Sequence, residues 1–250
     1  MSHSSPQLTH TVTDGVATVV IDNAAKRNAM TDDMWRSLPP LLAALEADPA
    51  VRVLVLTGAG GTFCAGADIS TLGSSGSQAQ ELAVAAEEAL AAFAKPTLAA
   101  VRGYCVGGGC QLAAACDLRF AAETALFGVT PSKLGIVYPA GSTRRLASLV
   151  GPATAKYLLF SGELIGTERA QRTGLVDEVL PEAELDKRVG EFTRILGERS
   201  QLTQAAAKEF IDGHVDRAAH WAEEARGSAD TAEGVAAFLE RRKPRFTWTV

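Results

Sequence analysis

The chain has 250 residues, of which 47% are hydrophobic and 21% are charged. This composition excludes disordered, collagen-like and coiled-coil proteins, and a chain of this length buries about 70% of its surface on folding. Its 24 basic and 29 acidic side chains give a net charge of −5. A nucleic acid is therefore not an expected partner, because it requires a basic face.

The cysteines and the hydropathy bear on cofactors and location. The four cysteines, at positions 64, 105, 110 and 116, form no CxxC pair of the kind typical of zinc sites. We therefore expect reduced thiols, no metal and a cytoplasmic protein. The first ten residues are polar, unlike a signal peptide, and no segment has the roughly 20 apolar residues of a membrane span. A membrane is therefore not an expected partner either.

In the first half of the chain, apolar runs of strand length alternate with helical patterns. Strands are predicted at 16–21, 51–56, 96–101 and 118–121. Helices are predicted at 34–47, 79–94 and 110–116, with a surface loop at 72–78. We expect Pro39 and Pro40 to kink or divide the first helix, because an interior proline costs about 3 kcal/mol.

From Ser142 onward every predicted element is a helix. These helices are expected at 142–150, 153–160, 167–172, 181–196, 202–211, near 215–226 and at 231–241. Strands that alternate with helices, followed by helices alone, predict an α/β core with a helical C-terminal part.

Two junctions between a strand and a loop carry small residues that suit ligand binding. Residues 63–69 read FCAGADI and residues 103–110 read GYCVGGGC. Glycine and alanine let the backbone approach a ligand closely, and the second junction ends at a predicted helix N-terminus. Backbone N–H groups from two such loops can form an oxyanion hole. Tight packing alone is the structural alternative for these glycines.

Five stretches of the chain together resemble one known family, the crotonase superfamily of enoyl-CoA hydratases and isomerases, over residues 10–246. These stretches are NAAKRNAMT (23–31), FCAGADI (63–69), KPTLAAVRGYCVGGGCQLAAACD (95–117), 162–179 with ERAQRTGLVDEV, and GVAAFLERRKPRF (234–246). The resemblance implies an α/β crotonase fold of repeated ββα units. It also implies a core at 1–190 that binds acyl-CoA, and a helical region at 191–250 that assembles the chain into a homotrimer or hexamer.

The resemblance also assigns roles to individual residues. It places an oxyanion hole for the thioester carbonyl on the N–H groups of Ala67 and Gly108, and implies no cofactor beyond the coenzyme A of the substrate. The residues implied in binding of the substrate or its coenzyme A are Lys26, Arg27, Ala29, Ala65, Asp68, Ile69, Pro131, Phe238 and Lys243. An ordinary solvated charge is the alternative for Lys26 and Arg27.

Two positions depart from the pattern of the hydratases in this family. Hydratases carry one catalytic glutamate three residues after the oxyanion glycine and a second in a later FGxPE segment. The matching residues here are Gln111 and Pro131. An amide can orient a water molecule but cannot take its proton, and proline has no side-chain heteroatom. Because each acid–base group contributes about 10²- to 10⁴-fold to a rate, we do not expect efficient hydration.

Tyr138 is the candidate proton donor near these positions. The run Thr130–Tyr138 resembles the TPxxLGxxY segment of methylmalonyl-CoA decarboxylase, a relative that has a histidine where this chain has Ala67. Loss of CO₂ from a malonyl-type thioester leaves an enolate without any base, so only a proton donor is then needed. Decarboxylation is therefore the favoured reaction, with Tyr138 or a water held by Gln111 as donor. A buried aromatic with a satisfied hydroxyl is the alternative role of Tyr138.

Two other functions stay open at this point. One is a protein that binds coenzyme A without catalysis, and the other is a weak hydratase or isomerase whose carboxylate has moved to a neighbouring turn. A solvated surface position is the simpler interpretation of each acidic residue that could serve. These residues are Glu87, Glu88, Asp117, Glu123 and Glu163.

Overall fold

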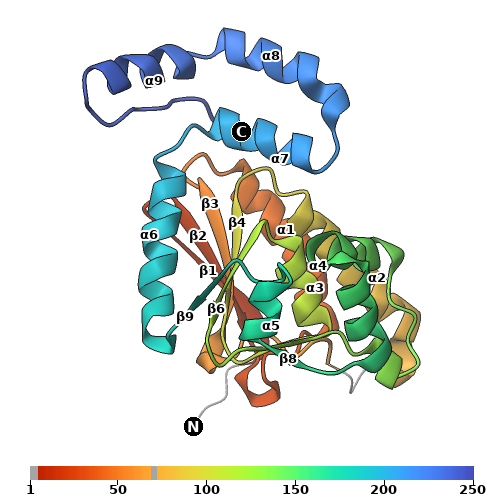
Figure 1. Cartoon of the computed structure of the whole chain (residues 1–250). Coiled ribbons are helices and arrows are strands. Elements are labelled where there is room, and N and C mark those ends of the chain that lie inside the picture. Colours follow the sequence, from red (N-terminus) through yellow and green to blue (C-terminus); the bar gives the residue numbers. More distant parts are fainter. Residues whose placement is uncertain (1–4, 69–71) are drawn as a thin grey trace.

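A six-stranded sheet runs through the centre of the molecule (Figure 1). The computed structural model describes residues 5–68 and 72–250, and for residues 72–77 the backbone alone. The strand order is β1-β2-β3-β4-β6-β9, with β1 antiparallel to β2 and all later pairs parallel. The strands are β1 (Gln7–Thr13), β2 (Val16–Asp22), β3 (Val53–Gly58), β4 (Thr97–Val101), β6 (Leu118–Ala122) and β9 (Glu178–Leu180).

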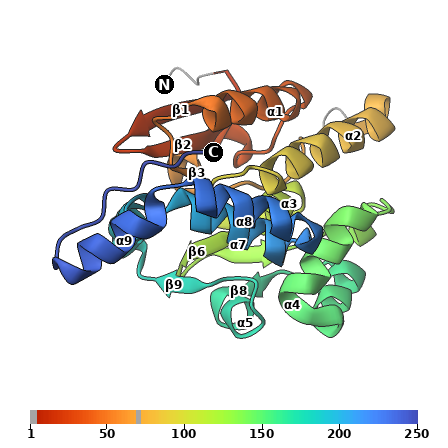
Figure 2. The ribbon, with the colours of Figure 1, turned by 90° about the horizontal axis from the view of Figure 1, so that it is seen from above.

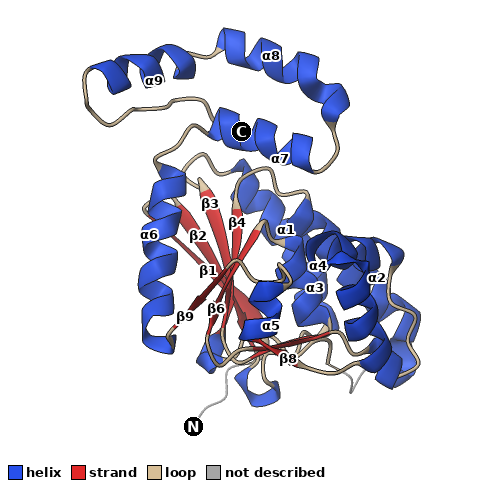
Figure 3. Ribbon diagram, in the orientation of Figure 1, coloured by secondary structure: helices blue, strands red, loops and turns tan. Residues whose placement is uncertain are grey.

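Helices cover both faces of this sheet (Figure 3). The helices are α1 (Asp32–Ala47), α2 (Leu72–Ala91), α3 (Gly108–Ala115), α4 (Ala140–Ser161), α5 (Thr167–Arg172), α6 (Leu185–Gly197), α7 (Gln201–Ile211), α8 (Ala218–Gly227) and α9 (Asp230–Leu239). None of the helices that the structure describes is long and apolar enough to cross a bilayer. The α/β class expected from the sequence is confirmed.

The two faces of β4 show how the strands divide the core. Leu98 and Ala100 pack with α6 residues such as Leu185 in one cluster, whereas Ala99 and Val101 belong to the larger cluster that contains α1, α2, α3 and α4. Successive side chains of a strand point to opposite faces. An uninterrupted apolar run is therefore what a parallel strand covered on both sides requires.

A second, smaller sheet continues from the loops of the first. It consists of β5 (Tyr104–Val106), β7 (Leu126–Gly128) and β8 (Ile165–Gly166). Isolated bridges extend it, because Cys64 pairs with Cys105 and Met30 pairs with Ala67. These strands of two or three residues were not predicted, since such short runs carry no periodicity. They bring the two glycine-rich junctions together.

The final helices, α7 to α9, stand above one end of the central sheet and extend away from it (Figures 1 and 2). Leu202 and Ala205 of α7 and Trp221 of α8 are buried in a small cluster separate from the main core. The predicted helical C-terminal part is thus present. The division at residue 190 stays a prediction, and this position lies within α6, which packs on the sheet.

Two expectations about helices were wrong. Helix α1 runs without interruption through Pro39 and Pro40. Its inner face buries Trp35, Leu38 and Leu42 to 1–2% exposure. At about 1.5–3 kcal/mol for each side chain, this burial outweighs the hydrogen bonds that the prolines cannot make. Helix α2 begins at residue 72, where a loop was predicted because serine and glycine are weak helix formers. The predicted break between 150 and 153 is present, at Gly151 (φ +73°).

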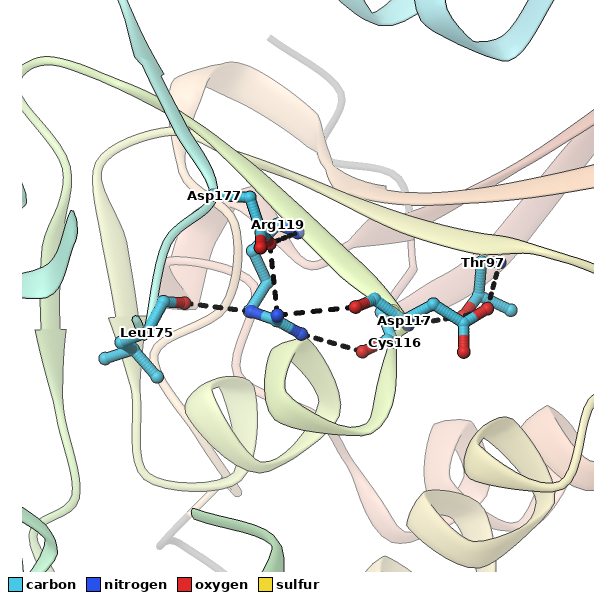
Figure 4. A network of polar contacts seen from close by, with 6 residues as sticks. All are labelled: Thr97, Cys116, Asp117, Arg119, Leu175 and Asp177. Atoms are coloured by element: carbon cyan, nitrogen blue, oxygen red, sulfur yellow. Dashed lines mark hydrogen bonds and ion pairs between the residues drawn. The ribbon is translucent and has the colours of Figure 1, made fainter. Parts of the chain in front are cut away.

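A buried arginine joins the end of α3 to the sheet (Figure 4). The Arg119 side chain is 2% exposed, and its guanidinium donates to the Cys116 carbonyl (2.7 Å) and the Leu175 carbonyl (2.9 Å). It also forms an ion pair with Asp177 (3.0 Å). Asp117 in turn accepts from the backbone N–H of Thr97 (2.7 Å). This network fixes α3 between β4, β6 and the segment before β9.

Candidate active site

The loop that follows β3 is held against β5. The Cys64 N–H donates to the Tyr104 carbonyl (2.9 Å), and the Val106 N–H donates to the Cys64 carbonyl (3.0 Å). The Cys64 thiol lies close to the Gly66 backbone, and its sulfur accepts from the Gly66 N–H (3.4 Å). Burial raises the pKa of Cys64 to about 12, so this cysteine is a neutral thiol and not a nucleophilic thiolate.

The same loop is held on its other side by Met30. The Met30 N–H donates to the Gly66 carbonyl (2.8 Å), and the Met30 carbonyl accepts from the Asp68 N–H (2.8 Å). Ala67 lies between these two bonded residues. Its own N–H donates to no other group in the part of the chain that the structure describes. The pairing therefore leaves one backbone donor at a defined position.

The first residue of α3 supplies a second backbone donor. Gly107 (φ +56°) turns the chain, and its N–H donates to the Gly128 carbonyl (2.8 Å). Gly108 follows as the first helical residue, where the N–H has no partner within the helix. Over residues 5–68 and 72–250, no other acceptor binds this N–H.

Two glycines let these donors approach each other. A Cβ on Gly108 would lie 3.5 Å from the Ala67 nitrogen, and a Cβ on Gly66 would lie 3.4 Å from the Gly108 nitrogen. A Cβ on Gly108 would also lie 2.9 Å from the Trp35 ring. The N–H groups of Ala67 and Gly108 are thus neighbours at the point where the two loops meet. The structure brings together the two residues predicted to form an oxyanion hole.

Both donors open into a cavity of about 820 Å³. Its lining is mostly apolar and comes from α1, α2, the two loops, α3 and residues 130–139. The lining residues are Trp35, Ala65, Gly66, Ala67, Ala79, Gln80, Ala83, Gly107, Gly108, Gln111, Thr130, Pro131, Leu134, Ile136, Val137, Tyr138 and Pro139. Six predicted site residues are among them: Ala65, Ala67, Gly108, Gln111, Pro131 and Tyr138. Within the described part of the chain, no charged side chain lines this cavity.

Gln111 connects the cavity to a buried carboxylate. The Gln111 side chain is 5% exposed, and its Nε2 donates to Oε2 of Glu87 on α2 (2.5 Å). Glu87 is 1% exposed. The interpretation of Glu87 as a solvated surface residue was therefore wrong, because its position on α2 turns it toward α3 and α4 and away from water.

The remaining partners of Glu87 come from α4. The Ser142 hydroxyl donates to Oε2, and the Arg145 guanidinium donates to Oε1. A second nitrogen of Arg145 lies 3.2 Å from the neighbouring Glu88, whose side chain is 54% exposed. Glu87 thus receives three donors, one of them cationic, which is what a buried carboxylate needs to remain charged.

Tyr138 lines the cavity just before α4. Burial raises the pKa of Tyr138 well above its ordinary value, and the nearby Cys110 and Glu87 raise it further. A phenol in these surroundings keeps its proton. Tyr138 can therefore donate a hydrogen bond or a proton, but it cannot serve as a base at neutral pH.

The residues predicted to bind coenzyme A are only partly brought together. Lys26 forms an ion pair with Asp68 (2.6 Å), and the Arg27 guanidinium lies over the Tyr104 ring, 4.9 Å from its centre. Ala29 is buried and does not line the cavity. Ile69 lies outside the described residues.

Phe238 and Lys243 are not brought to the cavity of their own chain. Phe238 is 82% exposed on α9, and Lys243 forms an ion pair with Glu198 (2.8 Å). Neither residue lines the cavity. The reason is the course of α7–α9, which leaves the sheet instead of folding back over α2 and α3 (Figure 1).

Trp35 on α1 lines the cavity and was not predicted as a site residue. Glu87, predicted only as one of five acidic residues that could replace the usual glutamates, lies behind the cavity. The position of Glu87 beside the cavity could have been inferred from its helical spacing in the sequence. Ala79 and Ala83 line the cavity, and Glu87 continues their spacing of four residues on the same face of α2. For Trp35 the signal is weaker, because a large aromatic on an amphipathic helix is as typical of the core.

Known proteins resemble this chain over most of its length. The family model described as "Enoyl-CoA hydratase/isomerase" matches residues 11–248. Crotonyl-CoA hydratase of Syntrophomonas wolfei is 38% identical over 92% of this chain and 94% of its own length. 2,3-Dehydroadipyl-CoA hydratase of Escherichia coli is 33% identical, over 92% of this chain and 94% of its own length.

Solved structures match the whole architecture. A crystal structure of an enoyl-CoA hydratase/isomerase family member has a TM-score of 0.92 and 39% identity, and it covers 98% of this chain and 100% of its own. The enoyl-CoA hydratase of Bacillus anthracis has a TM-score of 0.90 and 29% identity, over 96% of this chain and 98% of its own. The extent of these matches confirms the resemblance and the crotonase fold. The chain belongs to the enoyl-CoA hydratase/isomerase family of the crotonase superfamily.

Proposed function

We propose that this enzyme binds an acyl-CoA in the cavity and stabilises the enolate of its thioester with the N–H groups of Ala67 and Gly108. The observation that carries the proposal is the pair of adjacent backbone donors without a partner in the described part of the chain, both opening into an apolar cavity. Fixed donors in a site that excludes water stabilise a developing oxyanion strongly.

The favoured reaction is the decarboxylation of a malonyl-type acyl-CoA, one that carries a carboxylate on Cα. The bond from Cα to this carboxylate breaks, CO₂ leaves, and the electron pair of the bond passes into the enolate. Cα then takes one proton, either from the Tyr138 hydroxyl or from a water molecule held by Gln111. The donor regains its proton from the solvent, so the thioester product and CO₂ are the net result.

The lining of the cavity supports this choice over hydration. Gln111 and Pro131 occupy the two positions at which hydratases carry glutamate, and no described lining residue is a carboxylate. Hydration needs a group that takes a proton from water, whereas loss of CO₂ needs none.

A second candidate is hydration of an enoyl-CoA with Glu87 as the relocated carboxylate. Two observations favour it: the relative from Syntrophomonas wolfei is named a crotonyl-CoA hydratase, and Glu87 lies in contact with Gln111. Against it, all three donors that bind Glu87 compete for its lone pairs, and Glu87 itself does not line the cavity.

One assay separates these functions. The purified protein is incubated with crotonyl-CoA, methylmalonyl-CoA and ethylmalonyl-CoA, and mass spectrometry reads addition of water and loss of CO₂. We expect loss of CO₂ and little addition of water. Hydration alone would contradict the decarboxylase proposal. Binding of all three thioesters without turnover would identify a coenzyme A-binding protein that is not an enzyme.

A further inference from the structure

The carboxamide of Gln111 has two different ends, and the reaction depends on which end faces the ligand. Nε2 can only donate hydrogen bonds, and Oε1 can only accept them. Gln111 lines the cavity and also contacts Glu87 behind it. One end therefore faces the carboxylate and the other remains for the acyl group.

We propose that the buried carboxylate of Glu87 is a positioning group, which holds Gln111 so that the acceptor Oε1 faces the acyl group of the ligand. The inference rests on the proposed function in one respect, that the cavity holds an acyl-CoA. It goes beyond that function by naming the residue that decides whether Gln111 presents a hydrogen-bond acceptor or a donor to the cavity, which is called the polarity of the cavity below.

Arg145 fixes which groups around Glu87 donate hydrogen bonds and which accept them. A guanidinium only donates, so the Glu87 oxygen that it contacts, Oε1, must be an acceptor. The other oxygen, Oε2, accepts from Ser142 and from Gln111. In its ion pair with Arg145, the Glu87 carboxylate presents acceptor oxygens to its other neighbours. Only the Nε2 end of Gln111 can face it.

Burial stabilises this orientation of the Gln111 carboxamide. Glu87 is 1% exposed and Gln111 is 5% exposed, so bulk solvent does not replace either partner in the hydrogen bond between them. Rotation of the carboxamide would place Oε1 against the carboxylate, two acceptors at about 2.5 Å. Such a contact leaves both groups unsatisfied and mutually repulsive, which is strongly unfavourable in a buried site.

The acceptor in the cavity selects its partners. Gln111 Oε1 binds a proton donor, such as a water molecule or a hydroxyl of the acyl group, and it repels a carboxylate. A malonyl-type carboxylate is thus directed away from Gln111. A water held by Oε1 keeps its second O–H for Cα of the enolate, which is the role that decarboxylation requires.

Glu87→Gln tests the inference, because the structure predicts that it reverses Gln111. Arg145 still requires an acceptor, so the new carboxamide turns its oxygen to Arg145 and its NH₂ group to Gln111. Gln111 must then accept from it, and its own Nε2 turns to the cavity. We expect kcat for methylmalonyl-CoA to fall about 10-fold or more, whereas KM falls, because a donor now meets the substrate carboxylate.

Glu88→Gln is the matched control. Glu88 is the next residue of α2 and also contacts Arg145, but it is 54% exposed and contacts no cavity residue in the described part of the chain. We expect kcat and KM within twofold of the wild type. Equal losses of kcat in both variants, or a raised KM in Glu87→Gln, would overturn the proposal, because either result indicates a general structural role.

The double variant Glu87→Gln with Gln111→Glu provides a rescue. The carboxamide introduced at position 87 directs its NH₂ group to the carboxylate introduced at position 111. That carboxylate presents its other oxygen, an acceptor, to the cavity. We expect kcat to recover to within about threefold of the wild type, with a raised KM from repulsion of the substrate carboxylate. A double variant no better than Glu87→Gln alone would count against the inference.

A spectroscopic measurement keeps this inference separate from the proposed function. In a ¹H–¹⁵N spectrum, the side-chain amide pair of Gln111 is the one that disappears in Gln111→Glu. We expect one of its protons far downfield in the wild type, because it binds a carboxylate, and a return upfield in Glu87→Gln. An unshifted wild-type signal would refute the positioning role. A shifted signal in a protein that turns over no acyl-CoA would refute the proposed function alone.

Discussion

Gly108 shows how one residue without a side chain serves both packing and chemistry. Its N–H lacks a partner in the described part of the chain, and the space that a Cβ would occupy is filled by the Trp35 ring. The glycine is therefore required by the close packing of Trp35 on the start of α3, and not by a left-handed backbone conformation.

Gly108→Ala is expected to lower turnover by about 10²-fold or more, on the scale of one lost oxyanion donor. The added Cβ would lie 2.9 Å from the Trp35 ring, so the start of α3, with the Gly108 N–H, would have to move away from α1. The measurement is kcat for methylmalonyl-CoA. Gly190→Ala on α6, where a Cβ would meet nothing within 4 Å, is the control and should leave kcat unchanged. Turnover near the wild-type value in Gly108→Ala would contradict the oxyanion assignment.

Tyr138→Phe tests the proton donor. The variant removes only the hydroxyl, and we expect kcat for decarboxylation to fall about 10-fold or more. Because the pKa of Tyr138 is raised, its hydroxyl stays protonated as the pH passes about 10, the ordinary pKa of tyrosine. Wild-type kcat should therefore not decline between pH 8 and about 10. An unchanged kcat in Tyr138→Phe would return this residue to a packing role and leave the water at Gln111 as the donor.

At the scale of elements, α3 is the part that links the core to the site. Its first residue provides the proposed oxyanion donor, its fourth residue, Gln111, lines the cavity, and the carbonyl of its C-cap residue, Cys116, is bound by Arg119. Because Gln111 and Gly108 are on one rigid helix, their separation is set by helix geometry. Anything that shifts α3 moves both.

Arg119→Met tests this support. The substitution leaves the Cys116 and Leu175 carbonyls without their side-chain donor and leaves Asp177 with the backbone N–H of residue 119 alone, and each buried acceptor left unsatisfied costs about 1–3 kcal/mol. We expect the free energy of unfolding, measured by urea denaturation, to fall by about that amount. Arg172→Met, which breaks an exposed pair on α5, should change it by less than about 0.5 kcal/mol. Equal effects of the two variants would show that the Arg119 network is not a structural support.

At the scale of the whole molecule, the extension α7–α9 carries apolar side chains that the single chain does not cover. Four of them are at least two-thirds exposed: Ile211 (83%), Val215 (67%), Phe238 (82%) and Leu239 (74%). We propose that other copies of the chain cover them in a homotrimer or hexamer, because large apolar patches are rarely left in water. Such an assembly would also give Phe238 and Lys243 a route to the cavity of another copy.

Leu239→Glu is expected to weaken this assembly. A charge on the apolar face of α9 would have to be buried without a partner. Light scattering should give a mass of three or six chains for the wild type and a smaller mass for the variant. Lys187→Glu on α6, a residue that is 79% exposed, is the control and should keep the wild-type mass. A wild-type protein with the mass of one chain would contradict the proposal.

The sequence alone determined the α/β class, the family and the two loops that we propose supply the oxyanion donors. Alternating apolar runs predict buried strands, and glycine at Gly107 and Gly108 marks the turn into α3. It also predicts that the two usual glutamates are absent, because the resemblance places Gln111 and Pro131 at the matching positions. These are local properties, and each is visible in a few consecutive residues.

Only the tertiary structure determined which residues lie behind the cavity. Glu87 and Gln111 are 24 residues apart in the chain, and nothing in either segment shows that α2 and α4 enclose the carboxylate. The prolines of α1 were misjudged for the same reason, since the burial of Trp35 and Leu38 against other elements outweighs a local penalty. The polarity of the cavity, like the continuity of α1, depends on contacts between distant segments, which a pattern along the chain does not contain.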